Sequence, residues 1–178
     1  MKMKKYITLF SIVIIIITIL YLVWYAFPKN FNSTFNGILF NLDDPDVEEN
    51  VSIYFDGTIR KRLNGEMTYD GIVRIKGDKF PVPKGKRDLI INFDKNGMGL
   101  MTYMYYTENG EPKHYVYGTI TLNEDLTKLT ILRYRNNGSH GSWTKNDGDI
   151  ISAPATTRKE ALKIADPFVD YHLQQREK

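Results

Sequence analysis

Residues 99–122 read GLMTYMYYTENGEPKHYVYGTITL, two β-branched and aromatic runs joined by the dipeptide Asn109-Gly110. Asn-Gly tolerates positive φ at both centres of a type I′ turn, so the stretch predicts a hairpin between residues 99–107 and 114–122. In the first run both alternating sets of side chains are apolar or aromatic, whereas a strand covered on one face alternates apolar with polar residues. We therefore expect this strand to be covered on both faces, by the core and by a helix or a ligand.

Runs of the same character lie on either side of this hairpin, at residues 51–55, 71–76, 88–93 and 128–135. Further Asn-Gly and Asp-Gly pairs punctuate them, at residues 56–57, 64–65, 70–71, 96–97, 137–138 and 147–148. Short strands at this spacing predict a mainly β fold, an antiparallel meander that is closed as a barrel or folded as a sandwich. Asp70-Gly71 is either a turn or a bulge inside one longer strand.

The end of the chain predicts one α-helix. Thr157 and Glu160 have the spacing of a capping box, in which each side chain satisfies a free backbone N–H. An apolar stripe then follows at helical spacing: Ala161, Ile164, Ala165, Phe168 and Tyr171 or His172. Pro167 predicts a kink, or a restart with Asp166 as the cap. We expect the stripe to cover an exposed apolar face of the sheet.

The N-terminal run from Ile7 to Phe27 carries no charge. About twenty apolar residues in a helix cross the hydrocarbon core of a bilayer. The Leu, Ile, Val and Phe residues of this run favour insertion by about 4–8 kcal/mol in sum. The run is longer than the core of a signal peptide, and no small-residue cleavage site follows it. It therefore predicts a retained transmembrane helix, rather than a cleaved signal or a core helix, with Trp24 and Tyr25 at a membrane interface.

The lysines at the two ends of this run predict its orientation. Lys2, Lys4 and Lys5 precede it and a lone Lys29 follows, so the positive-inside rule places the N-terminus in the cytoplasm. The predicted organisation is a cytoplasmic tail at residues 1–6, a transmembrane anchor at 7–27, a stalk or lead-in at 28–50, and an extracytoplasmic β domain with a C-terminal helix at 51–178. The chain is thus expected in the cell membrane as a single-pass protein.

Composition narrows the class of protein further. About 150 residues beyond the anchor suffice for one domain with a core. The three N-terminal lysines account for the whole formal charge of +3, so the domain is not basic in the way that nucleic-acid binding requires. The chain has no cysteine, which excludes disulfides, thiol chemistry and lipoprotein processing. An exported domain that is stable without disulfides suits a bacterial envelope.

No catalytic, cofactor or metal site is predicted. His114, His140 and His172 match no zinc spacing, and without cysteine a zinc site would need carboxylates from distant turns. Residues 94–97 and 146–149 resemble calcium loops superficially, but neither has both the glycine and the glutamate of an EF-hand. Hairpin turns explain them better.

Three surfaces are candidates for binding. Tyr103 and Tyr105 are expected beside Tyr115 and Tyr117 across the hairpin, as a ligand or partner face. Basic residues gather within residues 58–87, at Arg60, Lys61, Arg62, Arg74, Lys76, Lys79, Lys84, Lys86 and Arg87. Such a face suits anionic lipid headgroups or wall polymers, or is a solvated exterior of strands. The acidic cluster at residues 43–49 is a cation site or is simply solvated.

Several stretches resemble parts of small, single-span proteins of Gram-positive bacteria that are themselves uncharacterised. They are Asp56-Gly-Thr-Ile with Tyr69-Asp-Gly-Ile-Val-Arg-Ile, Tyr117-Gly-Thr-Ile-Thr-Leu, and Ile151-Ser-Ala-Pro-Ala with Arg158-Lys-Glu-Ala-Leu. The resemblance covers most of residues 51–173. It implies a membrane-anchored protein with an extracytoplasmic β domain, and it implies no activity, substrate or site residue.

The outline of one span and an external β domain also resembles bacterial type I signal peptidases, and residues 82–86, ValProLysGlyLys, look like a segment of that family. The family's Ser-Met motif and its later Gly-Asp-Asn box are missing, and without a Ser-Lys pair there is no activated nucleophile. We therefore expect a non-catalytic binding or interaction module of the bacterial envelope. Two alternatives stay open: a small-molecule or lipid-binding β-barrel, and an envelope-acting hydrolase with a dispersed site.

Overall fold

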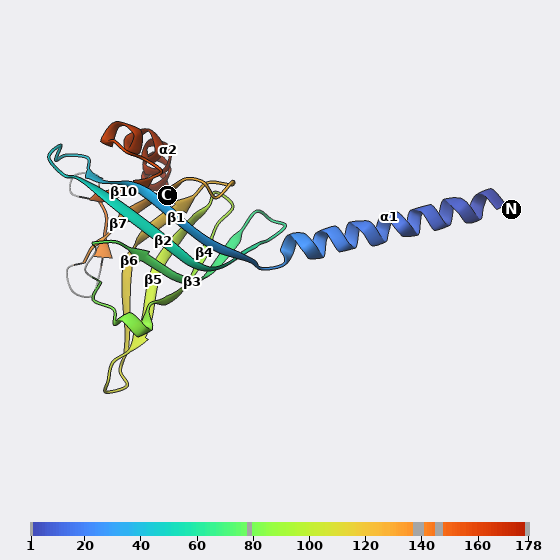
Figure 1. The fold of residues 1–178 in the computed structure, drawn as a ribbon, viewed down its shortest axis with the longest axis horizontal. Coiled ribbons are helices and arrows are strands. Elements are labelled where there is room, and N and C mark those ends of the chain that lie inside the picture. The colour runs from blue at the N-terminus through green and yellow to red at the C-terminus, as the bar shows by residue number, and fades with distance from the viewer. Residues whose placement is uncertain (1, 78–79, 137–140, 145–147, 177–178) are drawn as a thin grey trace.

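The computed structural model describes residues 2–77, 80–136, 141–144 and 148–176. A long N-terminal helix leads into a β-barrel, and a second helix lies on the side of the barrel (Figure 1). In chain order the elements are α1 Lys2–Ala26, β1 Lys29–Asn41, β2 Glu48–Lys61, β3 Met67–Ile75, the 3-10 turn η1 Lys84–Lys86, β4 Asp88–Phe93, β5 Met98–Tyr106, β6 Pro112–Leu122, β7 Leu129–Arg133, β8 Arg135–Asn136, β9 Gly141–Ser142, β10 Asp149–Ala153 and α2 Arg158–Arg176. The predicted mainly β fold with a C-terminal helix is confirmed.

Eight antiparallel strands close into a barrel in the order β1-β10-β7-β6-β5-β4-β3-β2. Strands β1 to β7 are neighbours as they follow in the chain, which is the predicted meander. β10 then pairs with β7 on one side and with β1 on the other, where Ile38 faces Ser152. This last pairing makes the sheet a barrel and not a sandwich. β8 and β9 form a separate two-stranded ribbon.

Side chains fill the interior of the barrel. In β4 the alternation is regular: Leu89, Ile91 and Phe93 are buried and their neighbours are exposed. The aromatic members of this buried cluster are Phe31, Phe35, Phe55, Tyr69, Phe93, Tyr103 and Tyr117. Four of these rings, those of Phe31, Phe35, Phe55 and Tyr69, pack edge to face, with the centroids of Phe55 and Tyr69 5.3 Å apart. The interior of an eight-stranded barrel either is filled by side chains or holds one small ligand, and here the side chains of this cluster form a packed core.

A second apolar cluster lies outside the barrel, under α2. It consists of Ile38, Phe40, Leu132, Trp143, Ile150, Ala155, Ala161, Ala165 and Val169. The helix contacts β10, β1 and β7, and the small side chains Ala161 and Ala165 allow it to lie close to them. The prediction that the C-terminal helix covers an apolar sheet face is therefore confirmed. It also explains why the second half of β1, from Gly37 to Asn41, is buried on both faces.

The prediction that a helix covers the outer face of β5 is wrong, and cover by a ligand stays a prediction. Met101 and Tyr103 point into the core, but Leu100, Met104 and Tyr106 on the outer face are exposed. In a closed barrel only the inner face of a strand meets the core. The one long helix that packs on the barrel covers β1, β7 and β10 instead of β5.

α2 begins as the sequence predicts. Thr157 precedes its first residue and accepts a hydrogen bond from the backbone N–H of Glu160 at 3.3 Å. The Glu160 carboxylate accepts from both the backbone N–H and the hydroxyl of Thr156, one residue before the expected partner. Of the kink or restart predicted at Pro167, the restart does not occur, because α2 runs through Pro167 as one helix; the kink stays a prediction.

Three Asn-Gly pairs form hairpin turns, as predicted: Asn64-Gly65, Asn96-Gly97 and Asn109-Gly110. Their geometry is not type I′, because only the glycine of each pair has a positive φ, of 75° to 85°. In the β2–β3 turn the N–H of Gly65 donates to the carbonyl of Arg62, and the N–H of Arg62 donates to the carbonyl of Glu66. These bonds describe a type I turn followed by a left-handed residue, a common three-residue hairpin loop.

The same bonds recur in the turns that contain Gly97 and Gly110. Residues at the start of the turns favour this geometry. The Asp94 carboxylate accepts from the backbone N–H groups of Asn96 and Met98, and the Thr107 hydroxyl accepts from that of Glu111. The pairs at residues 137–138 and 147–148 lie wholly or partly outside the described residues.

The predicted turn at Asp56-Gly57 is wrong. Gly57 of β2 and Gly71 of β3 are cross-strand partners inside long strands, with no shift of register. A Cβ on Gly57 would lie 2.3 Å from the carbonyl oxygen of Asp70, and Gly71 has a φ of 155°. The Tyr69 hydroxyl lies over this site, donating to the carbonyl of Ile72 and accepting from the N–H of Asp56. Here the glycines allow two strands to approach closely, a use of glycine in strands that is distinct from a turn.

The predicted lead-in at residues 28–50 belongs to the barrel. β1 occupies residues 29–41 and pairs with β2 from Lys29 to Phe40. Phe31 and Phe35 point into the core, which explains why this stretch is too apolar for a linker. Only Phe27 and Pro28 therefore separate α1 from the barrel.

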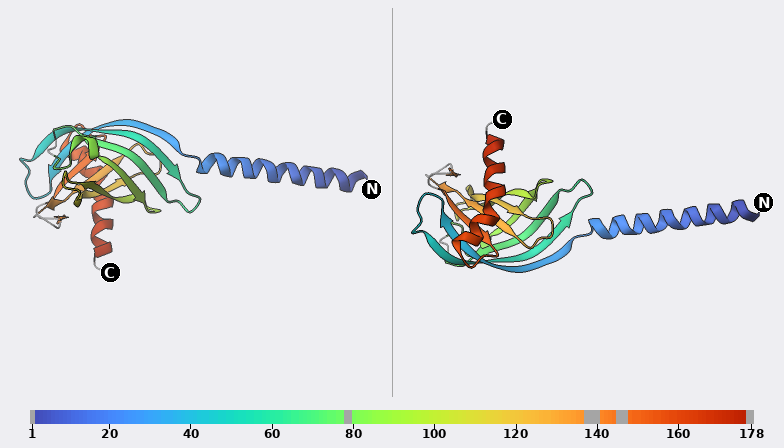
Figure 2. Two further views of the ribbon diagram at one scale, coloured as in Figure 1. Left: turned by 90° about the horizontal axis from the view of Figure 1, so that it is seen from below. Right: turned by 90° about the horizontal axis from the view of Figure 1, so that it is seen from above.

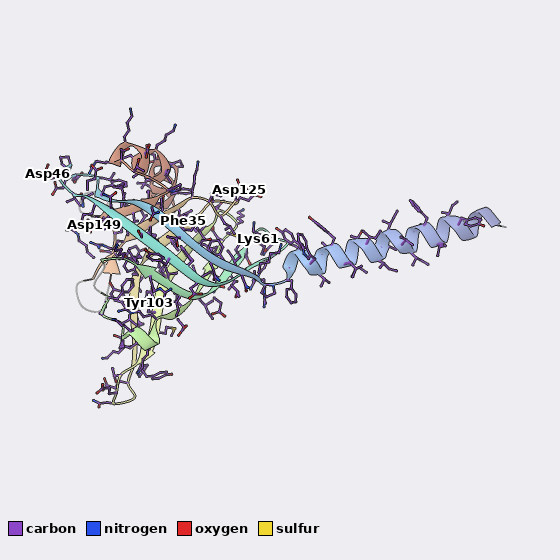
Figure 3. All side chains as sticks on the ribbon, in the orientation of Figure 1. Phe35, Asp46, Lys61, Tyr103, Asp125 and Asp149 are labelled. Carbon is purple, nitrogen blue, oxygen red and sulfur yellow. The ribbon has the colours of Figure 1, made fainter. Side chains whose placement is uncertain are left out.

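The barrel has two ends that differ in their distance from α1. Turns 62–66, 94–97 and 123–128 form the α1 end, because β1 starts beside α1 and the strands alternate in direction. Turns 42–47 and 107–111 lie at the opposite, far end. Lys61 and Asp125 mark the α1 end, Asp46 and Asp149 the far end, and Phe35 and Tyr103 lie between them (Figure 3). In two further views α1 projects away from the barrel, and the barrel and α2 both lie at the C-terminal end of α1 (Figure 2).

Candidate functional site

The predicted tyrosine face lies between the core and the far end of the barrel. Tyr103 and Tyr115 are cross-strand partners, with ring centroids 6.4 Å apart. Tyr105 is partly buried and pairs with Lys113. Tyr117 falls at a register shift opposite Met101 and Thr102, and this bulge turns its ring into the core.

Phe80, which the sequence analysis does not single out, covers this group. Its ring stacks on Tyr117 at 5.0 Å between centroids and meets Tyr103 edge-on at 5.4 Å. The Arg87 guanidinium lies 5.1 Å from the Phe80 ring, and its Nε donates to the carbonyl of Val82. Tyr103 and Tyr117 are fully buried as a result. The structure therefore brings the tyrosines together as part of the core, closed by Phe80 and Val82. The signal in the sequence for this cover is that Phe80 and Val82 are apolar residues within a stretch, 80–86, that is rich in proline and lysine.

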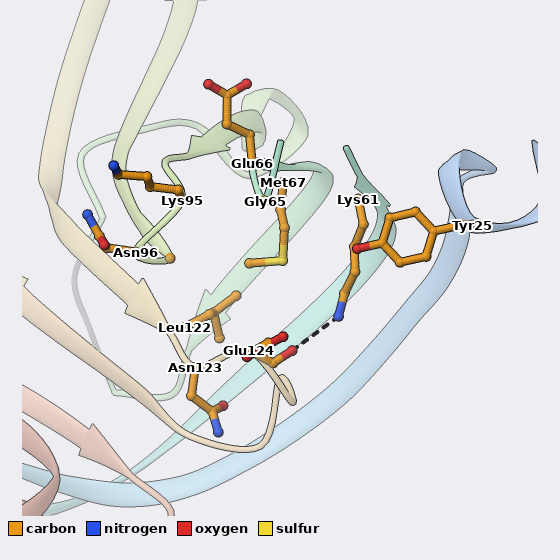
Figure 4. A pocket seen from close by; sticks show the side chains of 11 residues that line it. Tyr25, Lys61, Gly65, Glu66, Met67, Lys95, Asn96, Leu122, Asn123 and Glu124 are labelled. Atoms are coloured by element: carbon orange, nitrogen blue, oxygen red, sulfur yellow. Dashed lines mark hydrogen bonds between the residues drawn. The ribbon is translucent and has the colours of Figure 1, made fainter. Parts of the chain in front are cut away.

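A hollow of about 280 Å³ lies at the α1 end of the barrel (Figure 4). Its lining comes from the end of α1 and from all three turns of this end: Tyr25, Lys61, Gly65, Glu66, Met67, Lys95, Asn96, Gly97, Leu122, Asn123 and Glu124. The ammonium of Lys61 donates to the carbonyl of Glu124 at 3.1 Å, which ties β2 to the β6–β7 turn. The Arg62 guanidinium pairs with Glu66 at 3.1 Å on the rim.

The chemistry of this hollow is that of a polar binding surface. Two lysines and two glutamates alternate around Met67 and Leu122, and the lining contains no serine, cysteine or histidine. The arrangement can hold a group that carries both charge and apolar surface.

A second hollow, of about 450 Å³, lies between α2 and the β6–β7 turn. Pro154, Ile164, Pro167 and Phe168 provide its apolar lining, and Lys128, Glu160 and Lys163 provide its polar rim. Ile164 and Phe168 thus belong to the predicted apolar stripe but lie at the edge of the packed interface. Neither of them is completely covered by the sheet.

Of the three histidines, the structure describes the side chain of His114 alone. His114 is exposed on β6, His140 lies outside the described residues, and the side chain of His172 is not described. In the part of the chain that the structure describes, no three acidic or histidine side chains are placed to hold a metal ion.

The acidic cluster at residues 43–49 organises the β1–β2 turn. Asn41 accepts from the backbone N–H groups of Asp43 and Asp44, and the Asp44 carboxylate accepts from that of Asp46. Glu48 accepts from the N–H of Arg158 at the start of α2. The Asp44 side chain thus bonds within the turn and the Glu48 side chain bonds the turn to α2, which is a structural role for these two residues.

A buried polar group at the far end was not expected from the sequence. The Arg133 guanidinium pairs with the Asp149 carboxylate at 2.5 Å, and Asn41 donates to the other oxygen of Asp149 at 3.3 Å. The spacing of these residues along the chain gives no signal, because the barrel closure between β1, β10 and β7 brings them together. Asp149 therefore acts as the ion-pair partner of Arg133.

The basic residues between 58 and 87 do not form one face. Arg60, Lys61 and Arg62 lie at the α1 end, whereas Arg74 and Lys76 approach the far end on β3 and just beyond it. Lys79 lies outside the described residues. The antiparallel course of β2 and β3 separates what the sequence places close together.

Comparison of the chain with protein-family models, with curated proteins and with solved structures finds no match.

Proposed function

We propose that this chain is a single-pass membrane protein whose barrel lies outside the cytoplasm and acts as a non-catalytic binding module of the bacterial envelope. α1 supports the first part of the proposal. Its 18-residue window Leu9–Ala26 has a mean hydropathy of 2.6, and none of the window is buried against the protein. An apolar helix of this length without a protein partner fits a bilayer, and the lysines that precede it favour a cytoplasmic N-terminus.

The binding role rests on an apolar strip on the outer face of β4 and β5. The strip consists of Ile90, Leu100, Met104 and Tyr106, whose exposed fractions are 59, 47, 78 and 64%. These side chains contribute nothing to the core, and a group of exposed large apolar side chains on neighbouring strands is typical of an interaction surface. Lys86 and Asp88 line a shallow hollow beside Met104 and Tyr106 and give the strip a polar rim.

Site-specific photocrosslinking in cells that express the full-length chain tests this role. A photoreactive amino acid at Met104 is expected to yield a discrete adduct with an envelope component. The matched control carries the same amino acid at Thr34, an exposed outward position on β1. Equal labelling at the two positions contradicts the proposal. Turnover of wall or lipid substrates by the purified full-length protein would instead support the hydrolase alternative.

One observation favours the lipid-binding alternative. The hollow at the α1 end combines lysines with apolar side chains, and Tyr25 of the apolar helix contributes to its lining. A lipid bound there would meet the barrel at its end and not in its packed interior. Co-purification of lipid with the full-length protein, followed by mass spectrometry, measures this.

A further inference from the structure

The tip of the β2–β3 hairpin extends toward α1 beyond the point where the barrel begins. Lys29, the first residue of β1, pairs with Ile59 of β2. β2 continues past this pair through Arg60 and Lys61, which adds about 7 Å at the rise of a strand, and the turn 62–66 reaches further. All three ribbon views show this tip beside the C-terminal turn of α1 (Figures 1 and 2).

Contacts place the tip at the level of the end of α1. Tyr25 of α1 lines the same hollow as Lys61, Gly65 and Glu66 of the hairpin (Figure 4). The ammonium of Lys29 lies 3.9 Å from the centroid of the Trp24 ring. Trp and Tyr at the end of an apolar helix, with a lysine next to them, occupy the headgroup layer of a bilayer. Because only two residues join α1 to the barrel, the hairpin tip lies at the depth of that layer.

The side chains of the tip suit such a position. Leu63 stands at the apex with an exposed fraction of 67%, and Arg60 and Arg62 beside it are also exposed. Glu66 is the one acidic residue of this turn, and it is paired with Arg62. An exposed apolar side chain flanked by cationic ones is the combination that binds an anionic membrane surface, since the cations meet phosphates while the apolar group enters the acyl boundary.

The β5–β6 turn provides an internal comparison. It has the same backbone hydrogen bonds and the same Asn-Gly pair as the β2–β3 turn, but it lies at the far end of the barrel. Glu108 occupies the position that corresponds to Leu63, and Glu111 the position of Glu66, with no basic residue in the turn. Two turns of one geometry thus carry an apolar and cationic tip beside α1 and an acidic tip away from it.

We infer that the β2–β3 tip docks on the anionic headgroups of the bilayer that holds α1, with Leu63 at the acyl boundary and Arg60 and Arg62 on phosphates. This inference rests on the membrane location of α1 in the proposed function. The second contact restrains the tilt of the barrel, so that the β4–β5 strip is held at a set orientation above the membrane.

The absence of cysteine allows a direct test in the full-length protein. Single variants Asn64→Cys and Asn109→Cys are labelled with an environment-sensitive fluorophore and reconstituted into vesicles of phosphatidylcholine with or without phosphatidylglycerol, with nitroxide quenchers in the lipid. We expect quenching at position 64 to be at least twofold stronger than at position 109. Quenching at 64 is also expected to increase when the vesicles contain phosphatidylglycerol. That increase should be lost when Arg60→Gln and Arg62→Gln are added to the Asn64→Cys variant. Equal quenching at 64 and 109, or quenching at 64 that is independent of lipid charge, overturns the inference.

A third label separates this inference from the proposed function. Ile15→Cys lies within α1 and reports whether the helix spans the bilayer. Strong quenching at 15 without quenching at 64 leaves the anchor in place and refutes the docking of the hairpin. Absence of quenching at 15 refutes the membrane anchor itself. Leu63→Glu, which gives the tip the acidic residue of the far-end turn, is expected to reduce quenching at 64 to the level of 109.

Discussion

Tyr69 shows how one side chain stabilises the closest approach of two strands. Its hydroxyl bridges the N–H of Asp56 and the carbonyl of Ile72 beside the Gly57–Gly71 pair, and its ring is completely buried. Burial, together with the nearby Asp56 carboxylate, raises the pKa of Tyr69 from 10.0 to about 12. Both effects disfavour the tyrosinate, so the folded protein holds the neutral phenol more tightly than the unfolded chain does.

Tyr69→Phe tests this role through the pH dependence of stability. At pH 8 we expect the free energy of unfolding to fall by roughly 1–3 kcal/mol, because a backbone N–H and a carbonyl lose their partner. The folded pKa lies above the unfolded one, so the contribution of the phenol is complete below pH 10 and is lost as the pH rises toward 12. The difference between wild type and variant should therefore shrink over that interval. Urea unfolding of the detergent-solubilised protein at pH 8, 10 and 11 measures it, and a constant difference contradicts the assignment.

At the scale of elements, Arg158 fastens α2 to the barrel. Its guanidinium donates to the backbone carbonyls of Asn41, Leu42, Asp44 and Val47, all in or beside the β1–β2 turn. The same group lies 5.5 Å from the Phe40 ring in the cluster under the helix. Arginine can serve several carbonyls at once because its five N–H donors point in fixed directions.

Arg158→Met should therefore lower the free energy of unfolding by roughly 1.5–3 kcal/mol, the range for hydrogen bonds to a charged group. Lys163→Met on the exposed side of the same helix is the matched control, and its effect is expected to stay within about 0.5 kcal/mol. Chemical unfolding followed by the fluorescence of Trp143, which is buried under α2, reports the transition. Equal effects of the two substitutions would show that the clamp contributes little.

For the whole molecule, the proposed membrane location of the barrel depends on α1. The window Leu9–Ala26 of this helix is apolar and none of it is buried against the protein, so in water it would present a large apolar surface. In a bilayer the same surface favours insertion by about 4–8 kcal/mol. The proposed location follows from this difference.

A pair of charges in the middle of α1 should remove the protein from membranes. Ile14→Arg together with Ile17→Arg costs roughly 5–7 kcal/mol on the insertion scale, which is comparable with the whole favourable sum. We expect the double variant to move into the aqueous fraction of lysed cells, while Ile14→Leu with Ile17→Leu stays with the membranes after a carbonate wash. Retention of the arginine variant in the membrane fraction would contradict the anchor.

Local signals predicted both helices and the strands β2 to β7, but they missed the strands β1 and β10 and could not show which strands pair to close the barrel. The Asn-Gly pairs predicted three hairpins correctly because glycine supplies a positive φ wherever a tight turn needs one. They did not predict the turn type, which depends on side chains such as Asp94 at the start of the turn. The prediction of a turn at Gly57 was wrong because a glycine that allows a neighbouring strand to approach, as Gly57 and Gly71 do, cannot be distinguished in the sequence from a glycine in a turn.

The candidate sites depended even more on the fold. The four tyrosines are adjacent in the hairpin, as predicted, but the cover that Phe80 provides comes from a separate connection of the chain. The hollow at the α1 end assembles side chains from four segments that no spacing rule relates. The basic residues between 58 and 87 show the opposite effect of the fold: they are close in the sequence, but the structure places them at opposite ends of the barrel.

The sequence by itself determined the apolar helix at the start, the strands β2 to β7 with three of their hairpins, and the amphipathic helix at the end. Each of these follows from periodicity, turn chemistry or composition within a short window. Only the tertiary structure decided that β10 closes a barrel by pairing with β1, which face α2 covers, and that the β2–β3 tip stands beside α1. These features depend on contacts between residues far apart in the chain, and the packing of side chains in three dimensions selects among the arrangements that local patterns allow.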